Sequence, residues 1–168
     1  MTDDEIQQAS DLLKKLEPGF LPYPVFEQVA RLVALPILEL VPYRMANGQL
    51  EVLLLERPTN DGFWPNALHT PGTVIRASDL NAQTHGLEAA FTRLVHDELG
   101  DVRLGAPQFV ASLLHESKRG TEQAQVYCAE LLEEPKVGKL FAVSELPENL
   151  IAQQHDFIQR VAGRLRPA

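Results

Sequence analysis

The chain has 168 residues, with 15 Lys and Arg, 23 Asp and Glu and a single cysteine. A net charge of −8 argues against broad binding to nucleic acid, which requires a basic surface. No apolar run approaches the roughly 20 residues of a membrane span, and the first five residues are more acidic than a secretory signal. Since one cysteine forms no internal disulfide, we expect a cytoplasmic location. The length fits one domain with a short extension.

Residues 1–35 are predicted to form a helical extension. Apolar residues recur at helical spacing from Ile6 to Leu16, and Pro18-Gly19 ends this pattern. A second helix is predicted from Pro24 to Val33, because proline fits the first turn of a helix. We expect this extension to cover a sheet edge, a ligand or a subunit interface, and a homodimer is one expected assembly.

The next segment predicts a β-hairpin. Two strand-like runs, Ile37–Arg44 and Leu50–Arg57, flank Asn47-Gly48, a pair that adopts positive φ readily at the centre of a tight turn. Pro42 lies within the first run and indicates an edge strand or a strand end, because proline donates no hydrogen bond to a neighbouring strand.

The rest of the chain predicts a helix, three strands and a final helix. The apolar face of Gly86–Leu99 is typical of a helix that packs on a core, and Gly100 is placed to end it. The later elements are predicted at Gln108–Leu114, Gln123–Leu132, Lys139–Val143 and Glu148–Leu165. The first two of these flank a turn at Lys118-Arg119-Gly120, which indicates a second hairpin. This order favours an α/β (α+β) domain over residues 36–168, with a mixed sheet between helices.

Two adjacent carboxylates lie near the end of the predicted 86–99 helix. Glu98 lies about 40° around the helix from Leu94, at the edge of the apolar face, where a buried charge is costly unless a cation or donor accepts it. Asp97 and Glu98 also meet the unfavourable end of the helix dipole. A bound Mg²⁺ relieves both costs, because it takes oxygen ligands.

This helix and the segment before it resemble the box of the Nudix hydrolase family. The box reads G-x5-E-x7-R-E-U-x-E-E-x-G-U, in which U is a bulky aliphatic residue. Matching backwards from Gly100 places Arg93 on the box arginine and Val95 on U. The same match places Asp97 and Glu98 on the glutamate pair.

Segments on both sides of this helix extend the resemblance. Thr70-Pro71-Gly72-Thr73 is similar to the proline-glycine turn that starts the box, and Trp64 precedes it as a tryptophan often does. Phe141–Pro147 is similar to the family's late strand and acidic-leucine-proline turn. The resemblance covers about residues 36–160 and implies a Nudix-like α/β/α sandwich.

The box departs from the family pattern at two points. Gly72 to Arg93 spans 21 positions where the pattern has 14, which indicates an insertion of seven residues. The glutamate that follows the box arginine is a metal ligand in the family, and Leu94 stands at that position here. Two of the three helical carboxylates therefore remain.

The resemblance implies a hydrolase that cleaves a diphosphate linkage in a nucleoside diphosphate derivative by metal-assisted attack of water. Its implied catalytic residues are Glu98, Asp97 and Arg93, and its implied cofactor is Mg²⁺ or Mn²⁺. An acidic residue outside the box often completes the family's metal site. We expect Glu116 to join Glu98 and Asp97 as a ligand, with Glu122 as the alternative.

Four side chains are predicted to contact the nucleotide-like substrate, namely Trp64, Arg57, Lys118 and Arg119. Trp64 equally fits a core position, which tryptophans often occupy, and Lys118-Arg119 also fits a solvated basic pair, which is the usual role of such a pair in a turn. Leu94 favours a different function, that of a catalytically inactive Nudix-fold module which binds a nucleotide-like ligand or a protein partner. Nucleic acid and membranes are not expected partners.

Overall fold

The computed structural model describes residues 1–80 and 86–166 of the chain. Two 3-10 turns, η1 (Ala77–Asp79) and η2 (Val143–Glu145), accompany the main elements. In chain order the helices and strands are α1 (Asp3–Leu13), α2 (Tyr23–Leu32), β1 (Leu35–Ala46), β2 (Gln49–Glu56), β3 (Leu68–His69), β4 (Gly72–Val74), α3 (Glu88–Leu99), β5 (Gln108–Ser117), β6 (Gly120–Glu130), β7 (Lys139–Ala142) and α4 (Ala152–Leu165).

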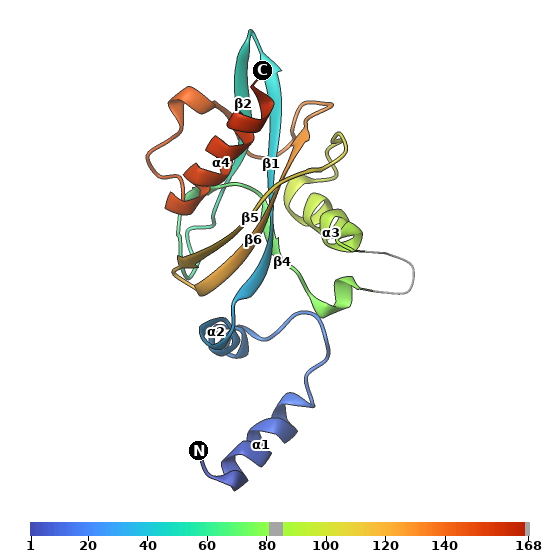
Figure 1. Cartoon of the computed structure of the whole chain (residues 1–168), viewed down its shortest axis with the longest axis vertical. Helices are drawn as coiled ribbons and strands as arrows, with labels where there is room; N and C mark the ends of the chain where they lie inside the picture. Colours follow the sequence, from blue (N-terminus) through green and yellow to red (C-terminus); the bar gives the residue numbers. More distant parts are fainter. Residues whose placement is uncertain (81–85, 167–168) are drawn as a thin grey trace.

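The strands form one mixed sheet of seven, with the order β3-β2-β1-β6-β5. β1 pairs in parallel with β6 and antiparallel with both β2 and β4, while β7 pairs with β2. Helix α3 lies on one face of the sheet and α4 on the other (Figure 1). The predicted α/β/α sandwich with a mixed sheet is confirmed.

Each face of the sheet carries its own hydrophobic core. Alternate residues of β1 point to opposite faces, so Leu38 and Leu40 pack under α3 while Val41 packs under α4. Leu94 of α3 and Phe157 of α4 are two of the large buried side chains that these helices contribute, each at most 2% exposed. The two cores hold α3 and α4 at fixed positions against the sheet.

The predicted hairpin is confirmed. β1 and β2 pair up to Ala46 and Gln49, and the turn residues Asn47 and Gly48 have φ angles of 51° and 77°. The second predicted hairpin is also present, and its strands are longer than predicted because pairing continues to Ser117 and Gly120.

The prediction that Pro42 marks an edge strand is wrong, because β1 lies in the middle of the sheet. The amide of Leu40 donates to the carbonyl of Pro71, on the side of β1 where β4 lies. Position 42 faces the same side, since alternate residues of a strand do so. There β4 pairing has ended at Glu39 and β2 pairing begins only at Tyr43. Pro42 therefore lies between the two paired stretches on this side of β1, and its missing N–H falls within neither of them.

The helices match their predictions apart from their ends. α3 ends at Gly100, which adopts the left-handed conformation with φ 60° and ψ 41°, as predicted. α4 begins at Ala152 and not at Glu148, because the preceding residues bond to β3. Leu68 donates its amide to the carbonyl of Asn149 and accepts from the amide of Ile151.

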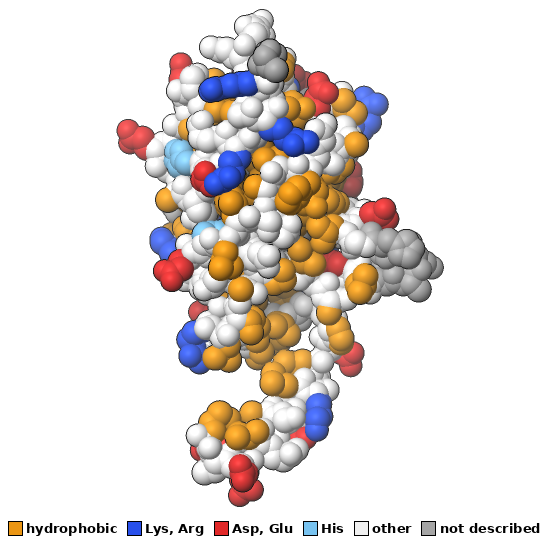
Figure 2. Space-filling view, viewed as in Figure 1, with side chains coloured by type: hydrophobic (Ala, Val, Ile, Leu, Met, Phe, Trp, Pro, Cys, Tyr) orange, Lys and Arg blue, Asp and Glu red, His pale blue; other side chains and the backbone are white. Residues whose placement is uncertain are grey.

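The two helices of the N-terminal segment differ in how they contact the sheet. α1 buries no residue, and Figure 1 shows it standing away from the sheet, whereas α2 buries Ala30 against Leu35 and Ile37. Within the described chain, eight of the fourteen exposed large hydrophobic residues lie in the first 33 positions: Met1, Ile6, Leu12, Leu13, Phe20, Tyr23, Leu32 and Val33. Apolar side chains are visible on the surface of α1 in Figure 2. No helix in the described ranges has the length and apolar character needed to cross a membrane.

Helix α2 is held against the turn between β5 and β6 by a backbone contact. Gly120 has a φ of 133°, and a Cβ on this residue would overlap the carbonyl oxygen of Ala30. Both the conformation and the close approach therefore require glycine at position 120.

We expect Gly120→Ala to lower the free energy of unfolding by about 2 kcal/mol, because the new Cβ strains the backbone and displaces α2. The matched control is Gly163→Ala in α4, where no atom lies within 4 Å of the added Cβ. That control is expected to stabilise the protein by about 0.5–1 kcal/mol, because alanine is the better helix former. Urea unfolding measures both, and an unchanged midpoint for Gly120→Ala would contradict the contact.

Candidate functional site

Glu98 lies in the last turn of α3 and faces the start of β4. Its Oε2 accepts a hydrogen bond from the amide of Gly72, with 3.1 Å between the two atoms. Burial raises the pKa of Glu98 to about 7, against the opposing effects of the Gly72 hydrogen bond and the charge of Arg57. The side chain is therefore half-buried at the edge of the helix, as its position relative to Leu94 predicts.

Glu39, a residue that sequence analysis missed, joins Glu98 at Gly72. Its side chain is 6% exposed, and its Oε2 accepts a hydrogen bond from Thr70 Oγ1 at 2.8 Å. A Cβ on Gly72 would lie 2.8 Å from the carboxyl carbon of Glu39, so glycine leaves room for this carboxyl. Burial raises the pKa of Glu39 to about 8. The signal that could have found it is a lone carboxylate within the apolar run of β1.

The free energy of unfolding is expected to fall as the pH rises from 5 to 8. Glu39 has a pKa of about 8 in the folded protein against 4.5 for a free glutamate, so over this range the folded state binds more protons than the unfolded state. We expect a decrease of more than about 1 kcal/mol that Glu39→Gln reduces, because an amide does not ionise. Burial lowers the pKa of His69 to about 4, so His69 opposes this decrease below about pH 6.5, where only its unfolded form is protonated, and has no effect above it. Urea unfolding at several pH values measures the free energy of unfolding of the unmodified protein and of Glu39→Gln. An equal dependence on pH in the two proteins would refute the prediction.

A third carboxylate, Glu122 of β6, lies within electrostatic range of Glu39. It is 1% exposed, and its Oε1 accepts hydrogen bonds from Ser117 Oγ at 2.9 Å and from Arg119 Nε at 2.7 Å. His115 Nε2 lies 3.2 Å from its Oε2, without the geometry of a hydrogen bond. Arg119 thus neutralises Glu122, and its charge also lowers the pKa of Glu39.

Two of the predicted substrate contacts, Arg57 and Trp64, reach this cluster from the loop after β2. Arg57 Nη1 lies 3.8 Å from Asp61 Oδ2, while its Nε is buried and has no hydrogen-bond partner among the described residues. Asp61 Oδ1 accepts from the amides of Phe63 and Trp64 and so shapes the loop. Trp64 is 9% exposed, and the guanidinium carbon of Arg119 lies 5.1 Å from its ring centroid. Trp64, Arg57 and Arg119 therefore come together.

Arg93 ties α3 to the segment that carries Gly72. Its Nε and Nη2 donate to Asp79 of η1 at 3.1 and 2.7 Å, and Nη1 donates to Thr73 Oγ1 at 2.6 Å. Nη2 also donates to the carbonyl of Val74 at 3.0 Å. The guanidinium thus binds three groups of the protein, and it positions β4 against α3.

The other predicted residues do not join this cluster of side chains, although the charge of Asp97 raises the pKa of Glu98. Asp97 is exposed on α3, and Glu116 is exposed on β5. Glu122 pairs across the hairpin with His115, so Glu116, one residue further on, points to the opposite face of the sheet. Lys118 Nζ donates to the carbonyl of Phe63 at 2.9 Å.

The donor set predicted for Mg²⁺ or Mn²⁺ does not fit a metal ion in this arrangement. Across residues 1–80 and 86–166, no three His, Cys, Asp or Glu side chains are grouped closely enough to hold one, so Glu98, Asp97 and Glu116 form no such group. Leu94, which the resemblance places at the third carboxylate of the box, is 1% exposed and packs in the core under α3.

The sequence itself identifies no relative. No model of a protein family matches it, and no curated protein matches it either. Solved structures do match the fold. The NUDIX domain of Shewanella oneidensis NrtR, complexed with ADP ribose, is 17% identical with a TM-score of 0.64, over 99% of this chain and 100% of that one.

Two further structures show the same architecture. C. elegans Ap4A hydrolase is 16% identical with a TM-score of 0.57, over 80% of this chain and 100% of its own. The C-terminal domain of mouse MUTYH, in complex with human PCNA, is 20% identical with a TM-score of 0.54, over 79% of this chain and 90% of its own. Together with the mixed sheet between α3 and α4, these likenesses show that the chain has the Nudix fold.

Proposed function

We propose that this chain is a Nudix-fold module that binds the diphosphate group of a nucleotide-like ligand without cleaving it. The observation that carries the proposal is Leu94, a core residue at the position where the resembled family has a metal-binding carboxylate. In support of this, Glu98, Asp97 and Glu116 form no group of three possible ligands among the described residues.

The charges around Glu98 support binding of an anion. Arg57 and Arg119 both lower the pKa of Glu98, so both guanidinium groups lie within electrostatic range of it. Guanidinium groups bind phosphate through paired, charge-assisted hydrogen bonds, and the buried Nε of Arg57 has no hydrogen-bond partner among the described residues. Glu39, with a pKa of about 8, is mostly protonated at pH 7 and does not repel an anion. The NrtR domain complexed with ADP ribose makes that compound a suitable first probe.

Calorimetry with ADP-ribose, combined with a hydrolysis assay in Mg²⁺ or Mn²⁺, tests this proposal. We expect saturable binding that Arg57→Gln weakens by about tenfold or more, since a hydrogen bond to a charged group contributes about 1.5–3 kcal/mol. Arg103→Gln is the matched control, because Arg103 forms only an exposed ion pair with Glu133. We expect no turnover above that of Glu98→Gln, and turnover that Glu98→Gln abolishes would overturn the proposal.

Hydrolysis of a diphosphate linkage with Mg²⁺ or Mn²⁺ is the second candidate function. The observation that favours it is the pair of carboxyl groups, Glu39 and Glu98, which approach Gly72 from two elements. Tight Mn²⁺ binding that depends on Glu98, together with turnover, would support hydrolysis over binding alone.

A homodimer through α1 is the role that we propose for residues 1–35. α1 presents exposed apolar side chains, including Ile6 and Leu13. Its first turn is acidic, at residues 3–5, and Lys14-Lys15 follow its end. An antiparallel pair of α1 helices therefore brings opposite charges together at both ends. Deleting residues 1–17 should convert a dimer to a monomer in light scattering, and a dimer that persists would refute this role.

A further inference from the structure

The segment from Phe20 to Ala30, which includes most of α2, contacts three parts of the chain that carry the candidate site. Phe20 lies beside η1, Tyr23 lies beside the loop after β2, and Ala30 lies beside the turn between β5 and β6. None of its residues is among the predicted site residues, and the segment lies outside the resemblance. These three contacts give the segment a means to position the site.

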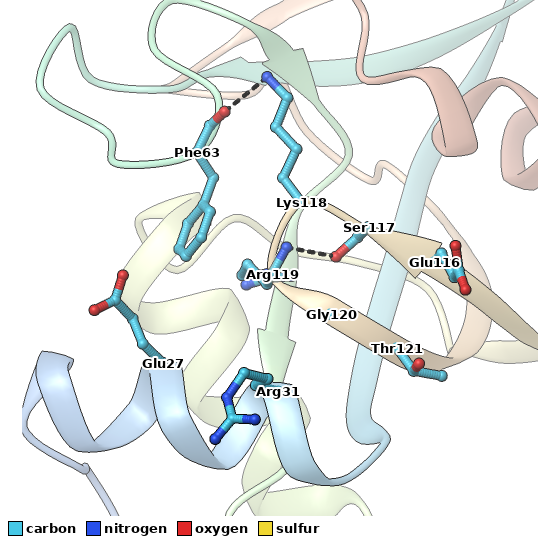
Figure 3. A pocket seen from close by; sticks show the side chains of 9 residues that line it. All are labelled: Glu27, Arg31, Phe63, Glu116, Ser117, Lys118, Arg119, Gly120 and Thr121. Atoms are coloured by element: carbon cyan, nitrogen blue, oxygen red, sulfur yellow. Dashed lines mark hydrogen bonds between the residues drawn. The ribbon is translucent and has the colours of Figure 1, made fainter.

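The contact of Tyr23 with the loop after β2 is close. A Cβ on Gly62 would lie 2.7 Å from Tyr23 Oη, so the hydroxyl group occupies the space that glycine leaves. The ring centroids of Tyr23 and Phe63 lie 6.1 Å apart, and Figure 3 shows the Phe63 ring extending from this loop toward α2. Asp61 of the same loop faces Arg57 and accepts a hydrogen bond from the amide of Phe63. Tyr23 thus rests on the part of the loop that holds the Arg57 guanidinium.

The contact of Ala30 with the turn between β5 and β6 brings α2 next to Arg119. Gly120 leaves space for the carbonyl oxygen of Ala30, so the backbones of helix and turn touch. Arg119 precedes this glycine, and its guanidinium bonds Glu122 and lies over the Trp64 ring. α2 therefore borders the turn that presents the second guanidinium of the proposed site.

The residue that leads into α2, Phe20, lies against η1. The guanidinium carbon of Arg76 lies 5.5 Å from the centroid of the Phe20 ring. The amide of Arg76 donates to Asp79, which also accepts from the Arg93 guanidinium. Phe20 therefore borders the turn through which Arg93 ties β4 to α3.

Residues 20–30 are nevertheless held by few buried contacts. Ala30 is the one residue of α2 that is buried against the described part of the chain, where it packs on the start of β1. A cavity of 460 Å³ opens between α2 and residues 116–121 (Figure 3). An element with so little buried surface opens at a small free-energy cost compared with global unfolding. The docking of α2 is therefore sensitive to what the loop and the turn bind.

We propose that residues 20–30 form a strap that positions the guanidinium groups of Arg57 and Arg119 for the diphosphate. Tyr23 is the positioning residue for Arg57, because it acts through the loop and does not touch the ligand. A docked strap holds both guanidinium groups in place, and a bound diphosphate in turn fixes the loop and the turn on which the strap rests. Ligand binding and docking of α2 therefore strengthen each other by the same factor. This inference rests on the proposed function, because it concerns the regulation of the same site.

Calorimetry with inorganic pyrophosphate tests the positioning role of Tyr23. Tyr23→Leu removes the ring and the hydroxyl group without changing the net charge. We expect it to weaken pyrophosphate binding about fivefold, at the lower end of the range that is typical of coupling between two sites. Tyr23→Phe keeps the ring beside Phe63 and should retain most of the affinity. The matched control is Phe109→Leu, which changes a comparably exposed aromatic residue on β5 and should have no effect.

Amide hydrogen exchange supplies the reciprocal measurement, which a merely structural role of Tyr23 would not affect. Saturating pyrophosphate should slow the exchange of α2 amides about fivefold in the unmodified protein, because linkage acts equally in both directions. In Tyr23→Leu this slowing should be lost. Exchange of α4 amides should be the same in both proteins, which also shows that the variant is folded.

The outcomes distinguish this inference from the proposed function. The inference is overturned if Tyr23→Leu binds pyrophosphate as tightly as the unmodified protein, or if pyrophosphate leaves the exchange of α2 unchanged. Equal acceleration of exchange in α2 and α4 by Tyr23→Leu would also overturn it, because the effect would then be a general loss of stability. Each of these results leaves diphosphate binding intact. An unmodified protein that binds neither pyrophosphate nor ADP-ribose would overturn the proposed function, and the inference with it.

Discussion

Replacing Arg93 with alanine is expected to lower the free energy of unfolding by about 3–5 kcal/mol. The guanidinium donates to Asp79, Thr73 and the carbonyl of Val74, and Asp79 is 7% exposed. The ion pair also holds the pKa of Asp79 below its ordinary value, against the effect of burial. Without Arg93, the Asp79 carboxylate loses the guanidinium that donates two hydrogen bonds to it, and the bond from Gly72 to Glu98 is left to join β4 to α3.

The matched control for this variant is Arg160→Ala on α4. Arg160 Nε bonds Asp156 at 2.8 Å, but both side chains are about half exposed. Its loss should cost about 0.5 kcal/mol, which is typical of a surface pair four residues apart. Denaturant unfolding compares the two variants, and similar losses would show that Arg93 has no structural role beyond that of a surface ion pair.

Restoring the box carboxylate by Leu94→Glu is expected to destabilise the protein by about 4 kcal/mol and to create no metal-dependent activity. Leu94 is 1% exposed and packs with Leu38 and Leu40 of β1. A glutamate there loses the apolar contacts and buries an ionisable group in the core. Stability is measured by denaturant unfolding, and activity by hydrolysis of ADP-ribose with Mn²⁺.

Two controls separate the effect of burial from the effect of the added residue. Leu94→Met keeps the apolar volume and should cost less than about 1.5 kcal/mol. Thr92→Glu adds the same charge on the exposed side of α3 and should be nearly neutral. A stable Leu94→Glu protein with Mn²⁺-dependent turnover would show that this position faces the site, contrary to the packing described.

Local patterns predicted much of the fold. Asn47-Gly48 predicted the first hairpin, and Gly100 predicted the end of α3. Both features depend only on the backbone conformations that one or two residues can adopt. The prediction from Pro42 was wrong, because a proline is accepted at this point of β1 only where the pairing with β4 has ended. The end of that pairing is a contact between distant segments, and no local sequence pattern contains it.

The candidate site was predicted less completely than the fold. Glu98 was found because its helical position relative to Leu94 is a local property. Glu39 was missed, because its role depends on β4 lying beside β1, a contact between residues far apart in sequence. Glu116 was preferred to Glu122 because the sequence does not specify which of the two faces the inside of the hairpin. The register of β5 and β6 places the Glu116 side chain on the face of the sheet opposite to that of Glu122.

Phosphorus NMR of the protein with ADP-ribose and Mg²⁺ tests binding and cleavage in one sample. Bound diphosphate changes the chemical shift or line width of its two resonances, while cleavage adds resonances of phosphate monoesters. We predict shifted or broadened diphosphate resonances that persist, with no monoester resonance beyond that of a sample with Glu98→Gln. Monoester resonances that grow with time and vanish in Glu98→Gln would contradict a binding module and establish a hydrolase.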